Sequence, residues 1–296
     1  MTTLRTIEKV GFIGLGIMGG SMAGHILAGG HELHVYNRTR ARADGLVARS
    51  ATWHDHPAGV AAICDVVFSI VGMPNDVEQL YLGESGLVAH ARPGTVLVDM
   101  TTSSPSLAAH IAATALGRNV QVLDAPVSGG DVGARDAKLT IMVGGAEAAF
   151  EHVTPILKLM GDNVRRQGEA GTGQHTKMAN QIAIANNMVA VCESLAYARA
   201  ASLDLKSVLL SIGSGAAASF ALNVLGPRMI DGDFAPGFFV RHFTKDMGIA
   251  LAEAERMKLA LPGLAQARAL YDKLAAGGHA DDGTQALFRL YGGEQV

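Results

Sequence analysis

The first half of the chain alternates short apolar runs with segments of helical periodicity. Several runs are rich in β-branched residues and are bounded by Gly, Pro, Asn or Asp, which favours strands over helices. We expect strands at Val10–Ile13, Leu33–Tyr36, Val66–Val71, Val96–Asp99, Val120–Leu123 and Leu139–Val143, with a short edge strand at Val164–Gln167. Strands that alternate with helices indicate a doubly wound α/β domain.

The pattern changes after the glycine-rich run Gly168–Gly173. An alanine-rich helical pattern, Gln174–Ser202, follows without a single Gly or Pro. At 1.5 Å per residue it predicts a rod of about 40 Å, long enough to bridge two domains. Further helical segments are expected at Leu205–Ile212, Ala217–Leu225, Lys245–Met257, Leu264–Ala275 and Thr284–Tyr291. We therefore predict an α/β domain over residues 1–169 and an all-α C-terminal domain over residues 170–296, joined by the long helix.

A glycine motif follows the first predicted strand and precedes an amphipathic segment that ends near Leu27. The motif reads Gly14-Leu15-Gly16-Ile17-Met18-Gly19. In such a turn the first glycine permits the sharp bend, the second lets a pyrophosphate approach the backbone, and the third lets the helix pack against the strand. Free N–H groups at the helix start suit the phosphates. The motif predicts a Rossmann-type dinucleotide-binding domain; a structural glycine turn is the alternative.

The end of the second predicted strand bears on which dinucleotide is bound. An NAD site of this type needs an Asp or Glu there, to hold the ribose 2′-hydroxyl. The segment reads Tyr36-Asn37-Arg38-Thr39 and has no carboxylate. Arg38 offers a fork of donors suited to a 2′-phosphate, with Asn37 and Thr39 beside it. We therefore expect NADP(H) to be preferred, with NAD(H) possible; an exposed arginine at a helix start is the alternative.

Other loops leave the predicted strands at the edge where open α/β sheets bind ligands. Two are cofactor candidates: one contains Met73 and Pro74, and the other contains Thr102. Both could equally be ordinary turns. A third loop contains Ser128-Gly129-Gly130, whose hydroxyl and open backbone N–H groups suit a small carboxylate, with a plain glycine turn as the alternative.

Lys177, Asn180 and Gln181 are spaced i, i+3 and i+4 near the start of the long helix, so they share one face. A lysine near a helix N-terminus opposes the helix dipole. Spacing alone favours a solvated lysine with polar neighbours. A catalytic lysine is the alternative.

Composition limits the remaining possibilities. The 296 residues are 49% hydrophobic and 17% charged, with a formal net charge of −3, which argues against nucleic-acid binding. Cys64 and Cys192 lie in apolar helix-like sequence and are expected to be unpaired thiols. No signal peptide or membrane-spanning run is apparent, so a cytoplasmic protein is expected. His54 and His56 have no apparent third ligand, so we expect no metal.

Taken together, the glycine motif, Asp124–Gly130 and the Lys177 helix start resemble the β-hydroxyacid dehydrogenase family, from Val10 past Lys245. The resemblance implies that Lys177 is the catalytic acid/base and that Gln181 assists it. It places Thr102 beside the nicotinamide ribose and brings Lys245 to the cofactor. It also implies that Ser128, Gly129 and Gly130 bind the substrate carboxylate, and that Asn180 lines the same pocket. Gln181 stands where many members carry Asn, and Ala137 takes a frequent glycine position.

The activity implied by the resemblance is hydride transfer between nicotinamide and a small β-hydroxy acid or semialdehyde acid, with Lys177 exchanging the proton. Lowering a lysine pKa from about 10.4 to about 7 requires about 4–5 kcal/mol. Reduction needs no such shift, so we expect reduction to be the physiological direction. The alternatives are an NAD-dependent 3-hydroxyisobutyrate dehydrogenase and a non-catalytic NADP-binding module. A homodimer or homotetramer that binds no nucleic acid and no membrane is expected.

Overall fold

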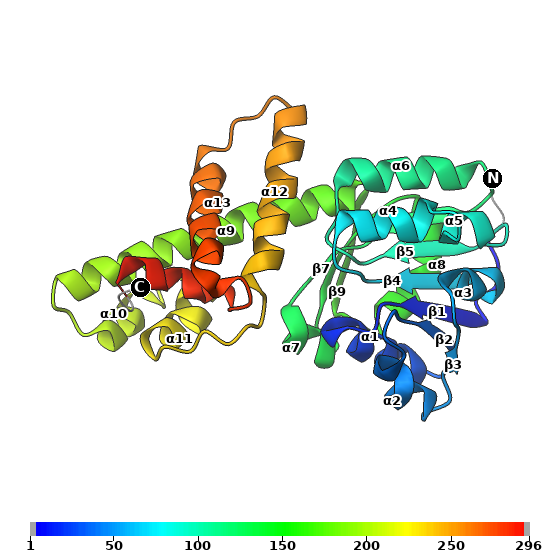
Figure 1. Ribbon diagram of the computed structural model, residues 1–296, viewed down its shortest axis with the longest axis horizontal. Helices are drawn as coiled ribbons and strands as arrows, with labels where there is room; N and C mark the ends of the chain where they lie inside the picture. Colours follow the sequence, from blue (N-terminus) through cyan, green and yellow to red (C-terminus); the bar gives the residue numbers. More distant parts are fainter. Residues whose placement is uncertain (1–3, 293–296) are drawn as a thin grey trace. The chain divides into compact units, whose positions relative to one another are not determined.

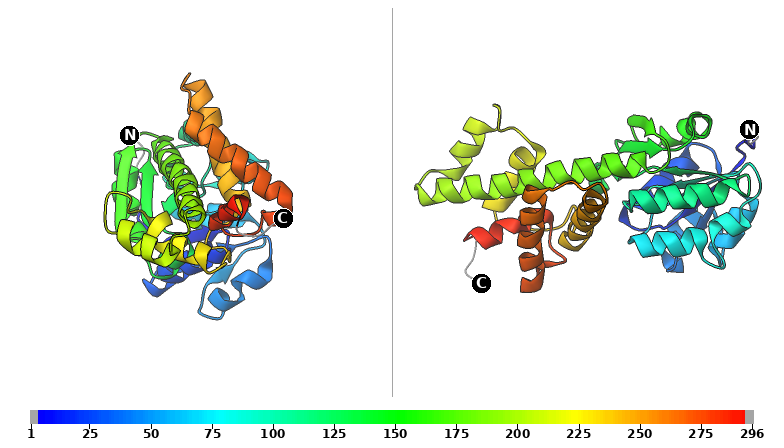
Figure 2. Two further views of the ribbon diagram at one scale, coloured as in Figure 1. Left: turned by 90° about the vertical axis from the view of Figure 1, so that its left-hand side faces the viewer. Right: turned by 90° about the horizontal axis from the view of Figure 1, so that it is seen from above.

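The computed structural model describes residues 4–292. The chain divides into two compact units, Met1–Lys177 and Met178–Val296. Helix α9 (Thr172–Ala200) is continuous and runs from the first unit into the second (Figures 1 and 2). Each unit has its own hydrophobic core and is described separately.

The first unit is built on a nine-stranded sheet in the order β3-β2-β1-β4-β5-β6-β8-β7, with β9 beside β8. The parallel part comprises β3 (Thr52–Trp53), β2 (Glu32–Tyr36), β1 (Lys9–Ile13), β4 (Val66–Ser69), β5 (Val96–Asp99) and β6 (Gln121–Asp124). Strand β8 (Thr140–Gly144) is antiparallel to β6 and β7 (Val127–Ser128), and β9 (Asn163–Gly168) is parallel to β8. The strand order reverses between β1 and β4, where open α/β sheets bind ligands.

Helices cover both faces of this sheet (Figure 1). Alternate strand residues point to opposite faces, so Phe12 and Phe68 lie in one core and Ile13 and Val67 in the other. The first core includes residues of α1 (Ile17–Ala28), α2 (Asp44–Val47), α7 (Gly130–Arg135) and α8 (Glu147–Leu157). The second includes residues of α3 (Pro57–Ile63), α4 (Pro74–Leu82), α5 (Leu87–His90) and α6 (Pro105–Leu116). The predicted doubly wound, Rossmann-type domain is confirmed.

The secondary-structure elements that the structure describes in the second unit are all helices, and an isolated β-bridge joins Phe239 and Gly283. The unit contains the remainder of α9, α10 (Leu205–Ile212), η2 (Ala221–Leu225), α11 (Gly226–Ile230), α12 (Val240–Arg256), α13 (Pro262–Leu274), η3 (Ala275–His279) and η4 (Thr284–Tyr291). Its core includes Leu195, Phe243, Tyr271 and Phe288, and the rings of Phe243 and Tyr271 meet edge to face at 5.1 Å. The predicted all-α second part is confirmed.

Several element boundaries differ from the sequence-based expectations. Strand β4 stops at Ser69 instead of Val71, because the paired strands β1 and β5 end opposite it. Helix α12 starts at Val240 instead of Lys245, because Val240 and Phe243 extend its buried face by one turn. The prediction of a helix over Ala217–Leu225 is wrong in its start, because a π-helical turn begins only at Ala221. The two-residue strands β3 and β7 were not predicted.

The two cysteines are free and buried, as expected, and burial raises the pKa of the Cys64 thiol to about 12. None of the helices in the described part of the chain combines the length and apolar character that a bilayer crossing requires.

Candidate active site

The three motif glycines occupy three different environments at the end of β1. Gly14 has φ +95°, and a Cβ there would lie 2.0 Å from the Ile70 carbonyl oxygen. A Cβ on Gly19 would lie 1.9 Å from the Gly14 carbonyl oxygen. A Cβ on Gly16 would meet no heavy atom within 4 Å. Gly14 and Gly19 are therefore required by the fold, whereas the space in front of Gly16 is open to a ligand.

The surroundings of this turn fit a dinucleotide. Helix α1 begins at Ile17 with no side-chain cap on its first N–H groups, so these groups are available to phosphate oxygens. Ile17 and Met73 are 64% and 45% exposed, so both apolar side chains are accessible to a ligand. Leu15 and Met18 lie in the same turn, buried and half-buried. Pro74 opens α4 directly after Met73. The open cradle and the exposed apolar side chains match the phosphates and rings of NAD(P).

The end of β2 is held against the glycine turn by Asn37. Its Oδ1 accepts a hydrogen bond from the Leu15 N–H at 2.9 Å, and its Nδ2 donates to the Thr39 carbonyl oxygen at 2.9 Å. The Arg38 side chain is 80% exposed, and its Nη1 lies 3.4 Å from Oδ1 of Asp76. Asp76 also accepts a hydrogen bond from the Met73 N–H at 3.0 Å. A carboxylate thus lies next to Arg38 after all, contributed by α4 instead of β2.

The loop after β5 carries Thr102, which is half-buried. On either side of it, Thr101 and Ser103 bond to the side chain of Gln174, which is fully buried. Gln174 Oε1 accepts from the Ser103 N–H at 2.9 Å, and Gln174 Nε2 donates to the Thr101 carbonyl oxygen at 2.7 Å. The buried Ser103 hydroxyl has no hydrogen-bond partner among the described residues. This loop is therefore fixed to the start of α9.

Two buried carboxylates end the adjacent strands β5 and β6, where Asp99 pairs with Asp124 in register. Burial raises the pKa of Asp99 to about 7, and the nearby Asp124 adds to the shift. Burial also raises the pKa of Asp124, against backbone hydrogen bonds that lower it. Both oxygens of Asp124 accept N–H bonds, from Gly171 at 2.7 Å and from Gln174 at 2.8 Å. These N–H donors favour the ionised form of Asp124. Of the two carboxyls, Asp99 is therefore the one more readily protonated near neutral pH, because burial raises its pKa to about 7.

Lys177 lies in the second turn of α9 and is 6% exposed. The segment before it approaches β6 and β8 very closely: a Cβ on Gly173 would lie 2.4 Å from the Met142 carbonyl oxygen. Gly171 has φ +91°. These glycines and Asp124 fix the start of the helix, and thereby the position of Lys177 within the first unit. A lysine is rarely buried to this extent unless its charge is paired.

The candidate carboxylate turn lies between β7 and α7. Ser128 is half-buried, Gly129 is exposed, and Gly130 starts α7. Gly129 and Gly130 have φ +130° and +64°, conformations that side chains disfavour. Ala137, which takes a position where glycine is frequent, also has a left-handed φ of +55°.

The second unit contains a chain of polar contacts that joins three predicted residues. Asn180 Nδ2 donates to Gln181 Oε1 at 2.8 Å, and Gln181 Nε2 donates to Asp246 Oδ2 at 2.6 Å. The other oxygen of Asp246 lies 3.1 Å from Lys245 Nζ. Gln181 and Asp246 are both buried, at 2% and 1% exposure. Asp246 therefore fixes the orientation of Gln181 and holds Lys245, a role that sequence reasoning missed.

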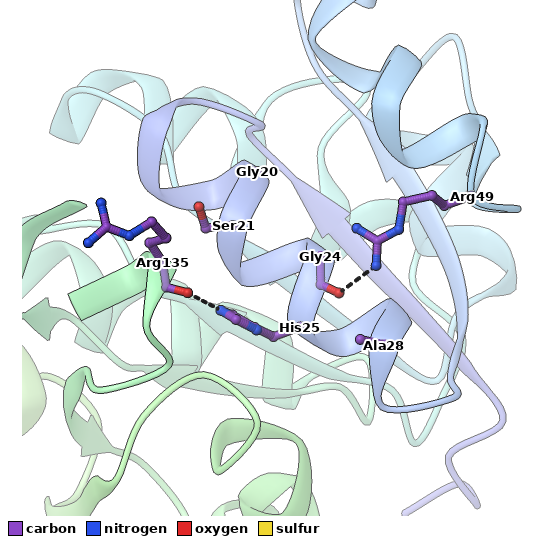
Figure 3. Close-up of a pocket in the computed structure, with 7 residues that line it drawn as sticks. All are labelled: Gly20, Ser21, Gly24, His25, Ala28, Arg49 and Arg135. Atoms are coloured by element: carbon purple, nitrogen blue, oxygen red, sulfur yellow. Dashed lines mark hydrogen bonds between the residues drawn. The ribbon is translucent and has the colours of Figure 1, made fainter. Parts of the chain in front are cut away.

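A separate cavity of about 320 Å³ lies against α1 (Figure 3). It is lined by Gly20, Ser21, Gly24, His25, Ala28, Arg49 and Arg135. The His25 ring bonds to the carbonyl oxygens of Ala134 and Arg135, and Arg135 pairs with Asp136. None of the predicted site residues lines this cavity, so it is distinct from the candidate active site.

Within the first unit, the structure brings together at the sheet edge the ends of β1, β2, β4, β5 and β6. Within the second unit, it brings together Asn180, Gln181 and Lys245. Sequence reasoning missed Asp76, Gln174 and Asp246. Asp246 follows Lys245 directly and Gln174 precedes Lys177 by one turn, so both were adjacent to a recognised signal. Among the described residues, no cluster of three or more His, Cys, Asp or Glu side chains could hold a metal.

Comparisons with known proteins agree with this geometry. Residues 9–168 match the NAD binding domain of 6-phosphogluconate dehydrogenase. Residues 171–291 match the domain described as the NAD-binding of NADP-dependent 3-hydroxyisobutyrate dehydrogenase. Fold and site thus define an NAD(P)-dependent dehydrogenase. The chain belongs to the β-hydroxyacid dehydrogenase family.

Individual relatives extend over nearly the whole chain. Probable 3-hydroxyisobutyrate dehydrogenase-like 1 of Arabidopsis thaliana, a mitochondrial protein, is 49% identical over 280 residues, 94% of this chain and 84% of the relative. The 2-hydroxy-3-oxopropionate reductase of Escherichia coli is 40% identical over 270 residues, 91% of this chain and 92% of the relative. The crystallised 3-hydroxyisobutyrate dehydrogenase of Mycobacterium tuberculosis, studied with L-serine, is 28% identical with a TM-score of 0.89, covering 96% of this chain and 99% of that one.

Proposed function

We propose that this protein is an NADP-preferring reductase of small semialdehyde acids, which catalyses the reverse oxidation of β-hydroxy acids more slowly at neutral pH. The observation that supports this most is the burial of Lys177, which is 6% exposed. Lys177 lies one helical turn after Gln174, whose side chain is hydrogen-bonded to the backbone on both sides of Thr102. A buried lysine at a ligand-binding sheet edge is a candidate proton donor.

The reaction divides between cofactor and protein. When bound, NADPH supplies the hydride. Lys177, protonated, donates a proton to the carbonyl oxygen of the substrate, and Asn180 and Gln181 orient that oxygen. Ser128 and the backbone N–H groups of Gly129 and Gly130 hold the substrate carboxylate. In the oxidative direction Lys177 must first lose its proton, so that oxidation is faster at alkaline pH.

Substrate class is proposed from the relatives. One relative is named a 2-hydroxy-3-oxopropionate reductase and others 3-hydroxyisobutyrate dehydrogenases, so the shared chemistry is a short acid with a carbonyl or hydroxyl close to the carboxylate. Cofactor choice is proposed from Arg38, which is exposed beside the glycine turn. The match to an NADP-dependent dehydrogenase supports the same choice.

One observation favours the NAD-dependent alternative. Asp76 lies 3.4 Å from Arg38, where its charge would repel a 2′-phosphate and where a carboxylate could accept a hydrogen bond from a ribose hydroxyl. NADP preference therefore requires that Arg38 attract the phosphate more strongly than Asp76 repels it.

A substrate screen tests the proposal. Oxidation of NADPH and of NADH is followed with short aldehydo and keto acids, on the wild type and on Arg38→Ala. The proposal predicts stoichiometric NADPH consumption with at least one semialdehyde acid, and a loss of NADPH preference in the variant. A clear preference for NADH that Arg38→Ala leaves unchanged refutes the NADP assignment. No turnover with any of these acids refutes the substrate class.

A further inference from the structure

A single buried amide joins the loop of Thr102 to the helix of Lys177. Gln174 is 0% exposed and makes two side-chain hydrogen bonds, to the Ser103 N–H at 2.9 Å and to the Thr101 carbonyl oxygen at 2.7 Å. These two backbone groups flank Thr102. Gln174 itself precedes Lys177 by three residues on α9.

The backbone groups define the orientation of this amide. A donor faces Oε1 and an acceptor faces Nε2, so turning the amide over would bring two donors together on one side and two acceptors on the other. A glutamine at this position satisfies both groups without a charge. Methionine, of similar length, satisfies neither.

Both ends of the link are held rigidly within the first unit. On the helix side, the Gln174 N–H donates to Asp124 Oδ2 at 2.8 Å, and the Gly171 N–H donates to Asp124 Oδ1 at 2.7 Å. On the loop side, the Thr101 N–H donates to Asp99 Oδ1 at 3.1 Å, and Thr101 Oγ1 accepts from the Val71 N–H at 2.9 Å. The side chain of Gln174 therefore connects two fixed segments, the start of α9 and the loop after β5, and sets the distance between them.

We propose that Gln174 is a positioning residue for hydride transfer, which keeps Thr102 and Lys177 at the separation that the reaction requires. The inference rests on the proposed function, in which Thr102 lies beside the nicotinamide ribose and Lys177 donates the proton. A displacement of about 1 Å between reacting groups can slow a reaction about a hundredfold. Loss of the link consequently slows the chemical step more than it weakens binding.

The experiment compares Gln174→Met with a matched control and with Lys177→Ala. The control is Thr95→Val, which removes a buried hydrogen bond, from Thr95 Oγ1 to the Cys64 carbonyl oxygen at 3.3 Å, at the start of β5 and away from the ligand-binding edge. The readouts are thermal stability, the Kd for NADPH, kcat, and the kinetic isotope effect with NADPH deuterated at the transferred position.

Gln174→Met is expected to lower kcat by about 10- to 100-fold. The Kd for NADPH should change by less than about threefold, and the isotope effect should rise as hydride transfer becomes rate-limiting. Thr95→Val should leave kcat and the isotope effect unchanged at a measurable cost in stability. If Gln174→Met matches Thr95→Val in kcat and isotope effect, Gln174 has only a structural role. If Lys177→Ala retains activity, the proposed function fails, whatever Gln174→Met does.

Gln174→Glu provides a second measurement if Gln174→Met does not fold. Its carboxylate would face the Thr101 carbonyl oxygen, and protonation would restore the donor. The ratio of its kcat to that of the wild type should therefore rise as the pH falls from 8 to 6. A ratio that does not change with pH contradicts the proposal.

Discussion

Substitution of Gly16 separates ligand binding from folding. An alanine at Gly16 places its methyl group in open space, with no protein atom within 4 Å. Gly16 has φ −70°, which alanine adopts without strain. The loss of glycine at the helix N-cap costs about 1 kcal/mol, and the reduced entropy of the unfolded chain offsets about 0.4–1 kcal/mol of it. The fold should consequently be unchanged within about 1 kcal/mol.

Cofactor binding should change much more. The methyl group occupies the space through which a pyrophosphate approaches the helix N-terminus, and displaced phosphates lose charge-assisted hydrogen bonds of about 1.5–3 kcal/mol each. Loss of a single such bond raises the Kd for NADPH at least about tenfold. The assay is a fluorescence titration with NADPH together with a thermal melt, on Gly16→Ala and on the control Gly20→Ala. A Cβ on Gly20 meets only the Leu15 carbonyl oxygen, at 4.0 Å.

The contrast with Gly19→Ala completes the test. A Cβ at Gly19 would lie 1.9 Å from the Gly14 carbonyl oxygen and 2.8 Å from a methyl carbon of Ile70, so this variant should lose stability by about 1–3 kcal/mol or more. If Gly16→Ala folds normally and binds NADPH within twofold of the wild type, the assignment of the glycine turn to the pyrophosphate is refuted.

Three further predictions concern the first unit. Asp76→Asn should raise the preference for NADPH over NADH by about three- to tenfold, since it removes a charge beside the expected 2′-phosphate. The control Glu78→Gln removes an exposed charge from the same helix and should leave the preference unchanged. Equal effects of the two variants in cofactor titrations would contradict this prediction. Because the pKa of Asp99 is raised to about 7 in the folded protein, the contribution of Asp99 to the free energy of unfolding should fall by up to about 4 kcal/mol as the pH rises from 4 to 8. Urea titrations of the wild type and of Asp99→Asn measure this contribution as the difference between the two at each pH. A difference that does not change with pH would refute the assignment. Ala137→Gly should raise Tm by about 2–4 °C, because Ala137 has φ +55°, a left-handed conformation that glycine adopts at lower cost than alanine. The control Ala134→Gly, within α7, should lower Tm. A fall in Tm for Ala137→Gly would count against the left-handed conformation.

Much of the fold could be predicted because its signals are local. Strand β5 was predicted with its observed bounds, Val96–Asp99, since four consecutive buried residues lie between turn formers. Helix α10 was likewise predicted at Leu205–Ile212. The strands β3 and β7 were missed because two residues show no periodicity, and both depend on pairing with strands already in the sheet.

Residues of the candidate site were singled out where a residue type is unusual for its position. Lys177 opposes a helix dipole, and Arg38 stands where a carboxylate was expected. Spacing alone favoured a solvated Lys177, and the roles of both residues stay predictions. Partners supplied by distant segments were not predictable. Asp76 is 38 residues from Arg38, and Asp246 is 65 residues from Gln181. Gln174 was overlooked because its hydrogen bonds are to backbone groups more than 70 residues away, which leave no signal in the sequence around it.

Replacement of Lys177 tests the central claim most directly. Hydride transfer is measured in a single turnover, with NADPH and a semialdehyde acid that the wild type reduces, on the wild type and on Lys177→Ala. Loss of the proton donor should slow the transfer by about 10²- to 10⁴-fold, and the Kd for NADPH should stay nearly unchanged. A Lys177→Ala variant that transfers hydride within tenfold of the wild-type rate would contradict the account.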